Sequence, residues 1–199
     1  NDAGMLFINH EFGRNTHVLG KGFPTTLADV RLSQAAHGCS VVRVAKDPSG
    51  KWDVEFDDRN RRITVNTPVV FDGPVAGSEF LENPANNPTL GTVNNCGNGF
   101  TPWGTYLTCE ENFNGYFGWL DPNFAPSEEQ ERYGFEEEGF GYGWHQFDAR
   151  FDLSNPDFVN EENRFGWVVE IDPMDLDTLN NMGYTLLQLK RLDEAERSL

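Results

Sequence analysis

Short runs of alternating apolar and polar residues dominate the first 173 positions of the chain. Alternation with a period of two is typical of half-buried β-strands, and Gly, Pro, Asn and Asp bound each run. The runs occupy residues 4–12, 39–58, 61–73, 101–111 and 164–173. The sequence therefore predicts a mainly β fold.

The clearest single element is a hairpin. Val42 and Val44 alternate with polar residues before a Pro-Ser-Gly turn, and Trp52 and Val54 do so after it. Two alternating runs around such a turn are typical of paired antiparallel strands.

Long segments rich in glycine and aromatic residues separate the strands, above all residues 121–152. The chain has 16 Phe, 5 Trp and 5 Tyr, which can fill the space between sheets. This favours partial β-propeller-like blades or a sandwich, joined by long loops. The charged run at 128–138 is predicted to be a solvated loop.

The hydrophobic period changes after Pro173. From Leu179 onward the apolar positions follow helical spacing, with a turn near 191–193. A short C-terminal helical hairpin over 174–199 is predicted beside a β portion over 1–173. The segment resembles a tetratricopeptide repeat, of which it covers about 24 of 34 positions. A single repeat cannot bury its own face, so we expect a protein partner on these helices.

Composition and charge limit the classes of partner that the chain can bind. The chain has 199 residues, enough for a sizeable core, and 15 basic against 32 acidic residues give a net charge of −17. This charge opposes binding to nucleic acid or anionic membranes and favours cations, although a merely solvated acidic surface is an alternative. No run of about 18 apolar residues and no signal-peptide pattern occurs. Three cysteines leave the redox compartment open.

Residues 94–112, NNCGNGFTPWGTYLTCEEN, carry the candidate chemistry. On structural grounds alone, Cys96 is a small buried residue in a turn where Gly97 and Gly99 take positive φ. Glu110 and Glu111 point to opposite faces if they lie on a strand, so one faces the interior.

A buried carboxylate requires a cation, hydrogen-bond donors or a proton. Ca²⁺ takes about six to eight oxygen ligands, and this segment is rich in such oxygens. The neighbouring amide side chains are Asn94, Asn95, Asn98 and Asn112.

Residues 94–112 also carry a resemblance to a known family, together with QAAHGCSVVRV, RRITVNTP, YGWHQFDARFD and RFGWVVEIDP. From about Asn9 to Pro173 the chain resembles the PhoX family of alkaline phosphatases. The resemblance implies a β-propeller with a cluster of iron and calcium that acts on phosphate monoesters. It also implies export, often by the twin-arginine route, to a periplasmic or extracellular location.

By the same resemblance Cys96 is an iron ligand, and Glu110, Glu111 and Glu170 are metal-binding carboxylates. Glu11, in an Asn-His-Glu motif that the family carries on an early strand, is a further metal candidate, together with His10. A thiolate beside carboxylates suits a transition metal, and oxygen ligands alone suit calcium. The resemblance assigns no catalytic residue in this chain.

Other residues and motifs provide weaker evidence about function. His37 and His145 are expected to be hydrogen-bonded structural residues. No HExxH, GxSxG or P-loop motif occurs, which removes the usual support for zincins, serine hydrolases and nucleotide triphosphatases.

Three functions remain open. The chain is a PhoX-type phosphatase or its metal-binding part, a non-catalytic calcium-binding propeller-like module, or a tetratricopeptide interaction scaffold. Family members continue for several hundred residues past VVEIDP, so we expect this chain to hydrolyse p-nitrophenyl phosphate weakly or not at all.

Overall fold

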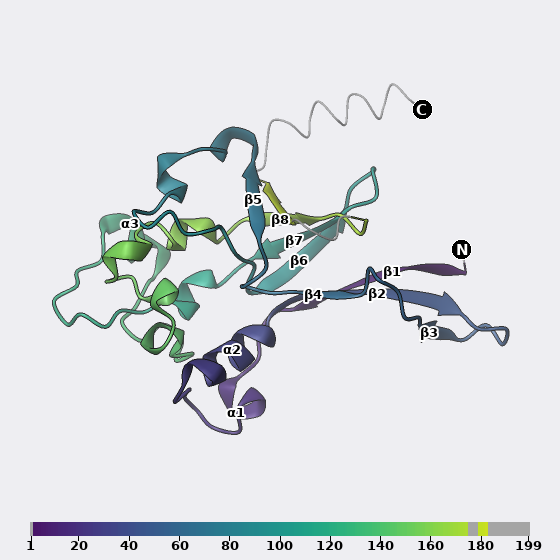
Figure 1. Cartoon of the computed structure of the whole chain (residues 1–199), viewed down its shortest axis with the longest axis horizontal. Coiled ribbons are helices and arrows are strands. Elements are labelled where there is room, and N and C mark those ends of the chain that lie inside the picture. Colours follow the sequence, from purple (N-terminus) through teal and green to yellow (C-terminus); the bar gives the residue numbers. More distant parts are fainter. Residues whose placement is uncertain (1, 175–178, 183–199) are drawn as a thin grey trace.

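The computed structural model describes residues 2–174 and 179–182, which form two β-sheets, a few short helices and long loops (Figure 1). The first sheet is antiparallel. In it β2 is flanked on one side by β1 and on the other by both β3 and β4, which pair with opposite ends of β2. These strands are β1 (Ala3–His10), β2 (Gly38–Lys46), β3 (Trp52–Val54) and β4 (Arg61–Ile63).

The second sheet has the order β5-β9-β8-β7-β6, with β5 and β9 parallel and the other pairs antiparallel. Its strands are β5 (Val69–Asp72), β6 (Asn95–Phe100), β7 (Tyr106–Glu110), β8 (Val168–Ile171) and β9 (Leu179–Met182). Neither sheet closes into a barrel within the described residues. The mainly β prediction is confirmed, whereas propeller-like blades stay a prediction.

The predicted hairpin is confirmed by β2 and β3. Val44 pairs with Val54 and Lys46 pairs with Trp52, and Gly50 in the connecting turn has a φ of 86°. The turn residues in the sequence therefore fixed the register of this pair.

Three α-helices were not predicted from the strand-dominated pattern: α1 (Asn15–Val18), α2 (Leu27–Ala35) and α3 (Glu128–Tyr133). The side chain of Thr26 caps α2 by accepting the N–H of Asp29 at 3.2 Å. Ser127 and Gln130 form a reciprocal capping box on α3. The prediction of a solvated loop at 128–138 is thus wrong for its first half, which is an exposed helix.

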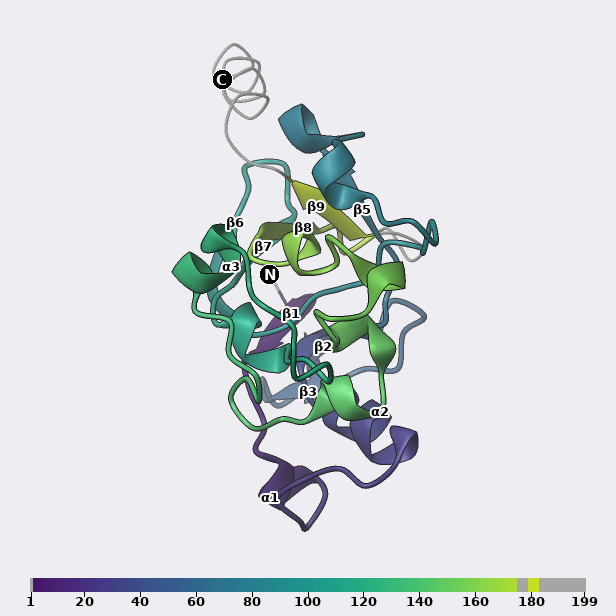
Figure 2. The same ribbon diagram turned by 90° about the vertical axis from the view of Figure 1, so that its left-hand side faces the viewer.

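Within the described part of the chain, seven short 3-10 helices lie in the loops. They are η1 (Gly73–Val75), η2 (Glu79–Leu81), η3 (Phe113–Tyr116), η4 (Trp144–Gln146), η5 (Ala149–Phe151), η6 (Pro156–Phe158) and η7 (Glu162–Arg164). Figure 2 looks onto this loop region, with β1 and β2 behind it.

The core has two parts. Between the sheets, Phe7 stacks on Tyr106 with ring centroids 4.6 Å apart. The buried residues of this part are Cys39, Val41, Ile63, Val69, Tyr106, Val169 and Ile171. The second part lies under the long loops and consists of Val30, Val65, Val93, Tyr116, Phe117, Phe135, Trp144, Phe151 and Phe165. The aromatic-rich loops therefore form a packed core of their own.

A buried ion network fixes these loops. Glu161 accepts hydrogen bonds from both Arg150 and Arg164, and all three side chains are almost completely buried. Arg150 also donates to the carbonyl of Val65 at 2.6 Å. Both arginines share Glu161, and their remaining donors bond backbone carbonyls, so the network holds segments distant in sequence together.

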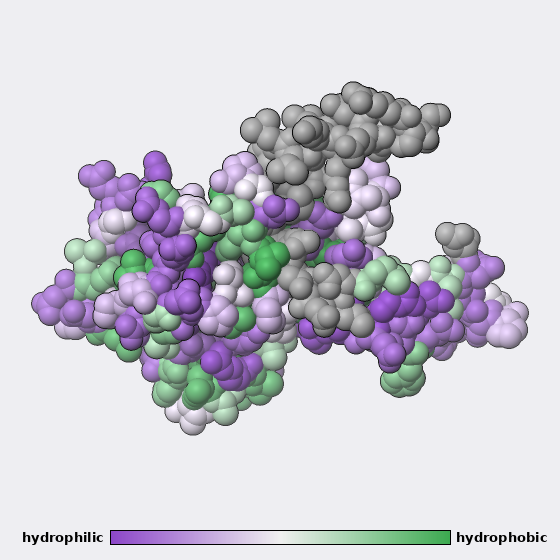
Figure 3. Space-filling model, turned by 45° about the horizontal axis from the view of Figure 1, so that its top comes forward, coloured by the Kyte–Doolittle hydropathy of each residue, from purple (hydrophilic) through white to green (hydrophobic). Residues whose placement is uncertain are grey.

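The surface is hydrophilic over much of the face in Figure 3 and is interrupted by hydrophobic patches. Large exposed apolar side chains include Phe56, Phe80 and Phe100. Within the described part of the chain, no helix has the length and apolar character needed to cross a membrane.

The C-terminal prediction requires a correction. Leu179–Met182 form strand β9, so the helical assignment is wrong for these four residues. Their backbone pairs with β5 and β8, which overrides the local apolar spacing. Apart from Met174 and β9, the predicted hairpin over 174–199 lies outside the described residues.

Candidate active site

The segment around Cys96 is a strand rather than a turn. Cys96, Gly97 and Gly99 lie on β6, and neither glycine has positive φ; Asn94, just before the strand, takes it instead with a φ of 53°. Asparagine tolerates this conformation better than most residues because its side chain bonds nearby backbone.

A β-bulge in β6 determines the position of Cys96 relative to β7. Asn95 pairs with Glu110 but Asn98 pairs with Thr108, so two residues of β6, Cys96 and Gly97, face a single residue of β7. A bulge of this kind bends the strand and re-aims its side chains.

Asn94 anchors the neighbouring segment to the start of β6. Its Oδ1 accepts the N–H of Asn112 at 3.0 Å, and its main-chain carbonyl accepts the N–H of Glu111 at 3.1 Å. Its Nδ2 donates to the hydroxyl of Tyr116 at 2.9 Å. Asn94 therefore holds Glu111 through its main chain, and Asn112 and Tyr116 through its side chain.

Asn9 ties β1 to the same region. Its Nδ2 donates to the carbonyl of Cys96 at 3.0 Å, while its Oδ1 accepts the hydroxyls of Tyr106 at 3.1 Å and Thr108 at 3.0 Å. Asn9 thus fixes the backbone of Cys96 relative to both sheets. It belongs to the Asn-His-Glu motif, but no role was predicted for it.

Cys96 lies close to two carboxylates. Burial raises the pKa of its thiol above the ordinary value, the N–H of Gly97 opposes this shift, and the carboxylates of Glu111 and Glu11 raise the pKa further. Both carboxylates are exposed. Three of the predicted metal ligands therefore share one end of the two sheets, where a cation would relieve their mutual repulsion.

Glu110 occupies a different environment. As predicted for adjacent strand residues, it is buried and Glu111 is exposed. Its carboxylate accepts the N–H groups of Val93 at 3.3 Å, Gly166 at 2.8 Å and Trp167 at 3.0 Å. Burial raises the pKa of Glu110 to about 7 against these donors. The carboxylate thus fastens the loop before β8 with backbone donors.

Glu170 lies at the other end of β7. It pairs with Leu107, about 10 Å along the strand from Glu110, and its Oε1 accepts the indole N–H of Trp103 at 2.7 Å and the hydroxyl of Thr105. The structure therefore separates Glu170 from Cys96 and Glu111.

The described residues contain no group of three or more His, Cys, Asp or Glu side chains with the geometry of a metal site. The thiol of Cys96 and the carboxylates of Glu11 and Glu111 have the chemistry that iron and calcium prefer. They fit part of a ligand shell and do not complete one.

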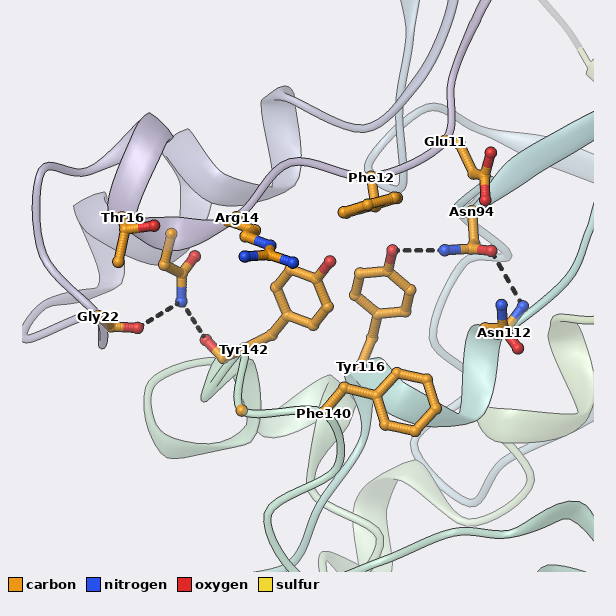
Figure 4. A pocket seen from close by; sticks show the side chains of 12 residues that line it. Glu11, Phe12, Arg14, Thr16, Gly22, Asn94, Asn112, Tyr116, Phe140 and Tyr142 are labelled. Carbon is orange, nitrogen blue, oxygen red and sulfur yellow. Dashed lines mark hydrogen bonds between the residues drawn. The ribbon is translucent and has the colours of Figure 1, made fainter.

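A cavity of about 480 Å³ adjoins this end of the sheets (Figure 4). Glu11, Asn94 and Asn112 form its polar end, at the right of the view, and Arg14 points into its middle. The aromatic walls are formed by Phe12, Tyr116, Phe140 and Tyr142. The sequence did not predict these wall residues, because a pocket aromatic and a core aromatic have the same local pattern.

The histidines lie outside this cavity. His10 forms a 2.8 Å hydrogen bond with the hydroxyl of Ser40, on the neighbouring strand. His37 is fully buried between the carbonyl of Ser33 at 2.8 Å and the N–H of Gly13 at 3.2 Å. The structural role predicted for His37 is confirmed, and His145 is also buried.

Comparison with known proteins decides the family. The model of the family described as alkaline phosphatase PhoX matches residues 1–187. This chain belongs to the PhoX family. The match continues past Pro173 and through β9, so the tetratricopeptide resemblance is not supported.

A solved structure of PhoX from Pseudomonas fluorescens, in complex with vanadate, a transition state analogue, is 40% identical with a TM-score of 0.85. The similarity covers 90% of this chain and 32% of that chain, so the present chain spans about a third of its relative. No curated protein matches this chain.

Proposed function

We propose that this chain contributes to a metal-dependent phosphatase site that hydrolyses phosphate monoesters. The observation that carries the proposal is the approach of Cys96 to Glu111 and to Glu11, of which Glu11 lines the polar end of a cavity, in a chain of the PhoX family. The vanadate in the related structure supports a phosphoryl-transfer site in that protein.

In this proposal Cys96 would hold iron, and Glu11 and Glu111 would hold iron or calcium. Bound cations of this kind supply positive charge to the transferring phosphoryl group and lower the pKa of a coordinated water. Glu110 and Glu170 have a positioning role: their carboxylates accept hydrogen bonds from protein donors and so hold β7 and the adjoining loops in place.

The chain's own residues set the geometry at this end of the cavity. Asn9 and Asn94 fix the backbone of Cys96 and of Glu111. Arg14 is the cationic side chain among the described residues that line the cavity. It would hydrogen-bond phosphoryl oxygens and offset some of the acidic surroundings.

A non-catalytic calcium-binding module is the second candidate. The incomplete ligand shell among the described residues favours it over a complete catalytic cluster. The location of the protein, periplasmic or extracellular, is proposed on the family's account alone.

Metal content tests the proposal. The chain is purified with iron and calcium supplied, and both metals are measured by elemental analysis in the wild type, Cys96→Ala and Cys109→Ala. We expect Cys96→Ala to lose iron and Cys109→Ala to keep it. Cys109 is a matched control because it lies across the bulge from Cys96 and offers its carbonyl, at 3.7 Å, to the Cys96 thiol.

Two results would contradict the metal assignment. One is a wild-type protein that holds neither metal. The other is an equal loss of iron in both variants, which would indicate that the thiols serve packing instead.

A further inference from the structure

The aromatic half of the cavity has no role in the function proposed above. Phe12 follows β1, Tyr116 ends η3, and Phe140 and Tyr142 lie on the loop after α3, so the walls come from three separate segments (Figure 4). Tyr116 is buried and stacks on Tyr142 with ring centroids 4.4 Å apart. Phe12 and Phe140 are 57% and 56% exposed, so these two rings contribute little to the core.

The backbone holds Phe140 in its exposed position. A methyl group on Gly115 would lie 2.0 Å from the ring of Phe140, so the absence of a side chain there makes room for the ring. The N–H of Phe140 donates to the carbonyl of Gly115 at 2.8 Å. The preceding Gly139 has a φ of 50° and a Cβ there would meet the carbonyl oxygen of Phe117 at 2.3 Å. The loop is thus built to present this ring.

Phe12 lies on the side of the cavity opposite Phe140 (Figure 4). Phe12 comes directly after Glu11, at the polar end, and faces the hydroxyl side of Tyr116 across the cavity (Figure 4). Asn94 fixes that hydroxyl by donating to it. The aromatic residue Phe12 therefore follows directly in sequence after Glu11, one of the proposed metal ligands.

We propose that this aromatic half is the subsite for the alcohol part of the phosphate ester, and that it favours flat aromatic groups, as in aryl phosphates and nucleoside monophosphates. The proposal rests on the proposed function, since it takes the phosphoryl group to lie at the polar end with Glu11, Asn94 and Asn112. A volume of about 480 Å³ is in the range of small-molecule sites. A flat ring would gain a stacking contact with Phe12 or with Phe140 that an aliphatic alcohol cannot form.

Binding of a phosphate-free probe tests the subsite without any need for metal or turnover. Adenosine and ribose are titrated separately into the chain, and their dissociation constants are measured by ligand-observed NMR. We expect adenosine to bind at least about fivefold more tightly than ribose, as stacking of a base is worth about 1–3 kcal/mol.

Substitutions at the cavity test whether Phe12 and Phe140 bind the adenosine. Phe12→Ala and Phe140→Ala should each weaken adenosine binding about fivefold to tenfold, which is the range of a lost aromatic contact. Phe12→Tyr, which keeps the ring, should bind as the wild type does. Phe56→Ala is the control, because Phe56 is fully exposed just beyond β3. A circular dichroism spectrum and melting curve for each variant confirm folding.

Equal affinity for adenosine and ribose would overturn the proposal, as would adenosine binding unaffected by both alanine variants. Hydrolysis of p-nitrophenyl phosphate is measured in parallel on the same protein. A chain that hydrolyses the ester but does not prefer adenosine retains the proposed function and loses the subsite. A chain that prefers adenosine but lacks metal and turnover retains the aromatic site and loses the phosphatase.

Discussion

Single residues at this site act mainly by satisfying backbone groups. Asn94 accepts and donates to three partners from a left-handed conformation, and buried Glu110 fastens a loop through three backbone N–H groups. The sequence identified Glu110 and Glu111 as a buried and an exposed pair from strand alternation alone. It did not predict that backbone donors satisfy Glu110, because those donors come from residues distant in sequence.

His37 gives a prediction for stability against pH. Burial lowers its pKa from the usual 6.5 to about 4, assisted by the nearby charge of Arg62 and opposed by the carbonyl of Ser33. Since the N–H of Gly13 donates to Nε2, protonation there would break that hydrogen bond. The unfolded chain takes up this proton at higher pH than the folded chain does. Stability is therefore lost as pH falls from about 6.5 towards 4 and is retained above that window.

Urea unfolding between pH 7 and pH 4.5 measures this effect. The wild type should lose about 2–3 kcal/mol more than His37→Asn over this range, as each pKa unit is worth about 1.4 kcal/mol. His17→Asn, at an exposed position, should follow the wild type. Parallel pH curves for the wild type and His37→Asn would show that another group is responsible.

At the scale of elements, the strand pattern was largely predictable and the helices were not. The period-two runs correspond to strands in both sheets, although β3 is exposed along its whole length, including Trp52 and Val54. Helix α2 had a visible signal, Thr26 three residues before Asp29, and α3 had Ser127 three residues before Gln130. These two helices were not predicted because α3 is mainly charged and exposed and α2 has only a weak apolar face.

The bulge in β6 and the positive φ of Asn94 could not be predicted from this sequence alone. Gly97 and Gly99 were the natural candidates for an unusual backbone, yet both lie on the strand. Pairing of β6 with β7, in which Asn95 meets Glu110, decides where the extra residue goes. A single-sequence analysis cannot see that register.

Asn9 gives a prediction for the junction of the elements. Asn9→Ala removes the donor to the Cys96 carbonyl and the acceptor for the hydroxyls of Tyr106 and Thr108, two buried residues. We expect a loss of about 1–3 kcal/mol in the free energy of unfolding.

Asn98→Ala is the matched control. Asn98 is an exposed asparagine on β6, and its loss should change stability by less than about 0.5 kcal/mol. Similar melting temperatures for Asn9→Ala and the wild type would remove Asn9 from this structural role.

The whole molecule combines an intersheet core, a separate aromatic core under the loops, and a cavity at the end of the sheets where Glu11 and Cys96 lie. The sequence identified the family, and its assignment of Cys96, Glu111 and Glu11 as metal ligands stays a prediction. It missed the cavity, because a cavity is defined by loops that meet only in the folded chain. Arg14 is the cationic side chain among the described residues that line this cavity, in a chain whose net charge is −17.

Phosphatase activity of a chimera tests the central claim most directly. In it residues 1–187 replace the aligned segment of Pseudomonas fluorescens PhoX, and hydrolysis of p-nitrophenyl phosphate is followed with iron and calcium present. The account predicts turnover that Cys96→Ala or Glu111→Ala lowers by about 10²–10³ and that Cys109→Ala leaves within a few-fold, since loss of one transition-state contact commonly costs that much. An active chimera indifferent to Cys96→Ala and Glu111→Ala would contradict it.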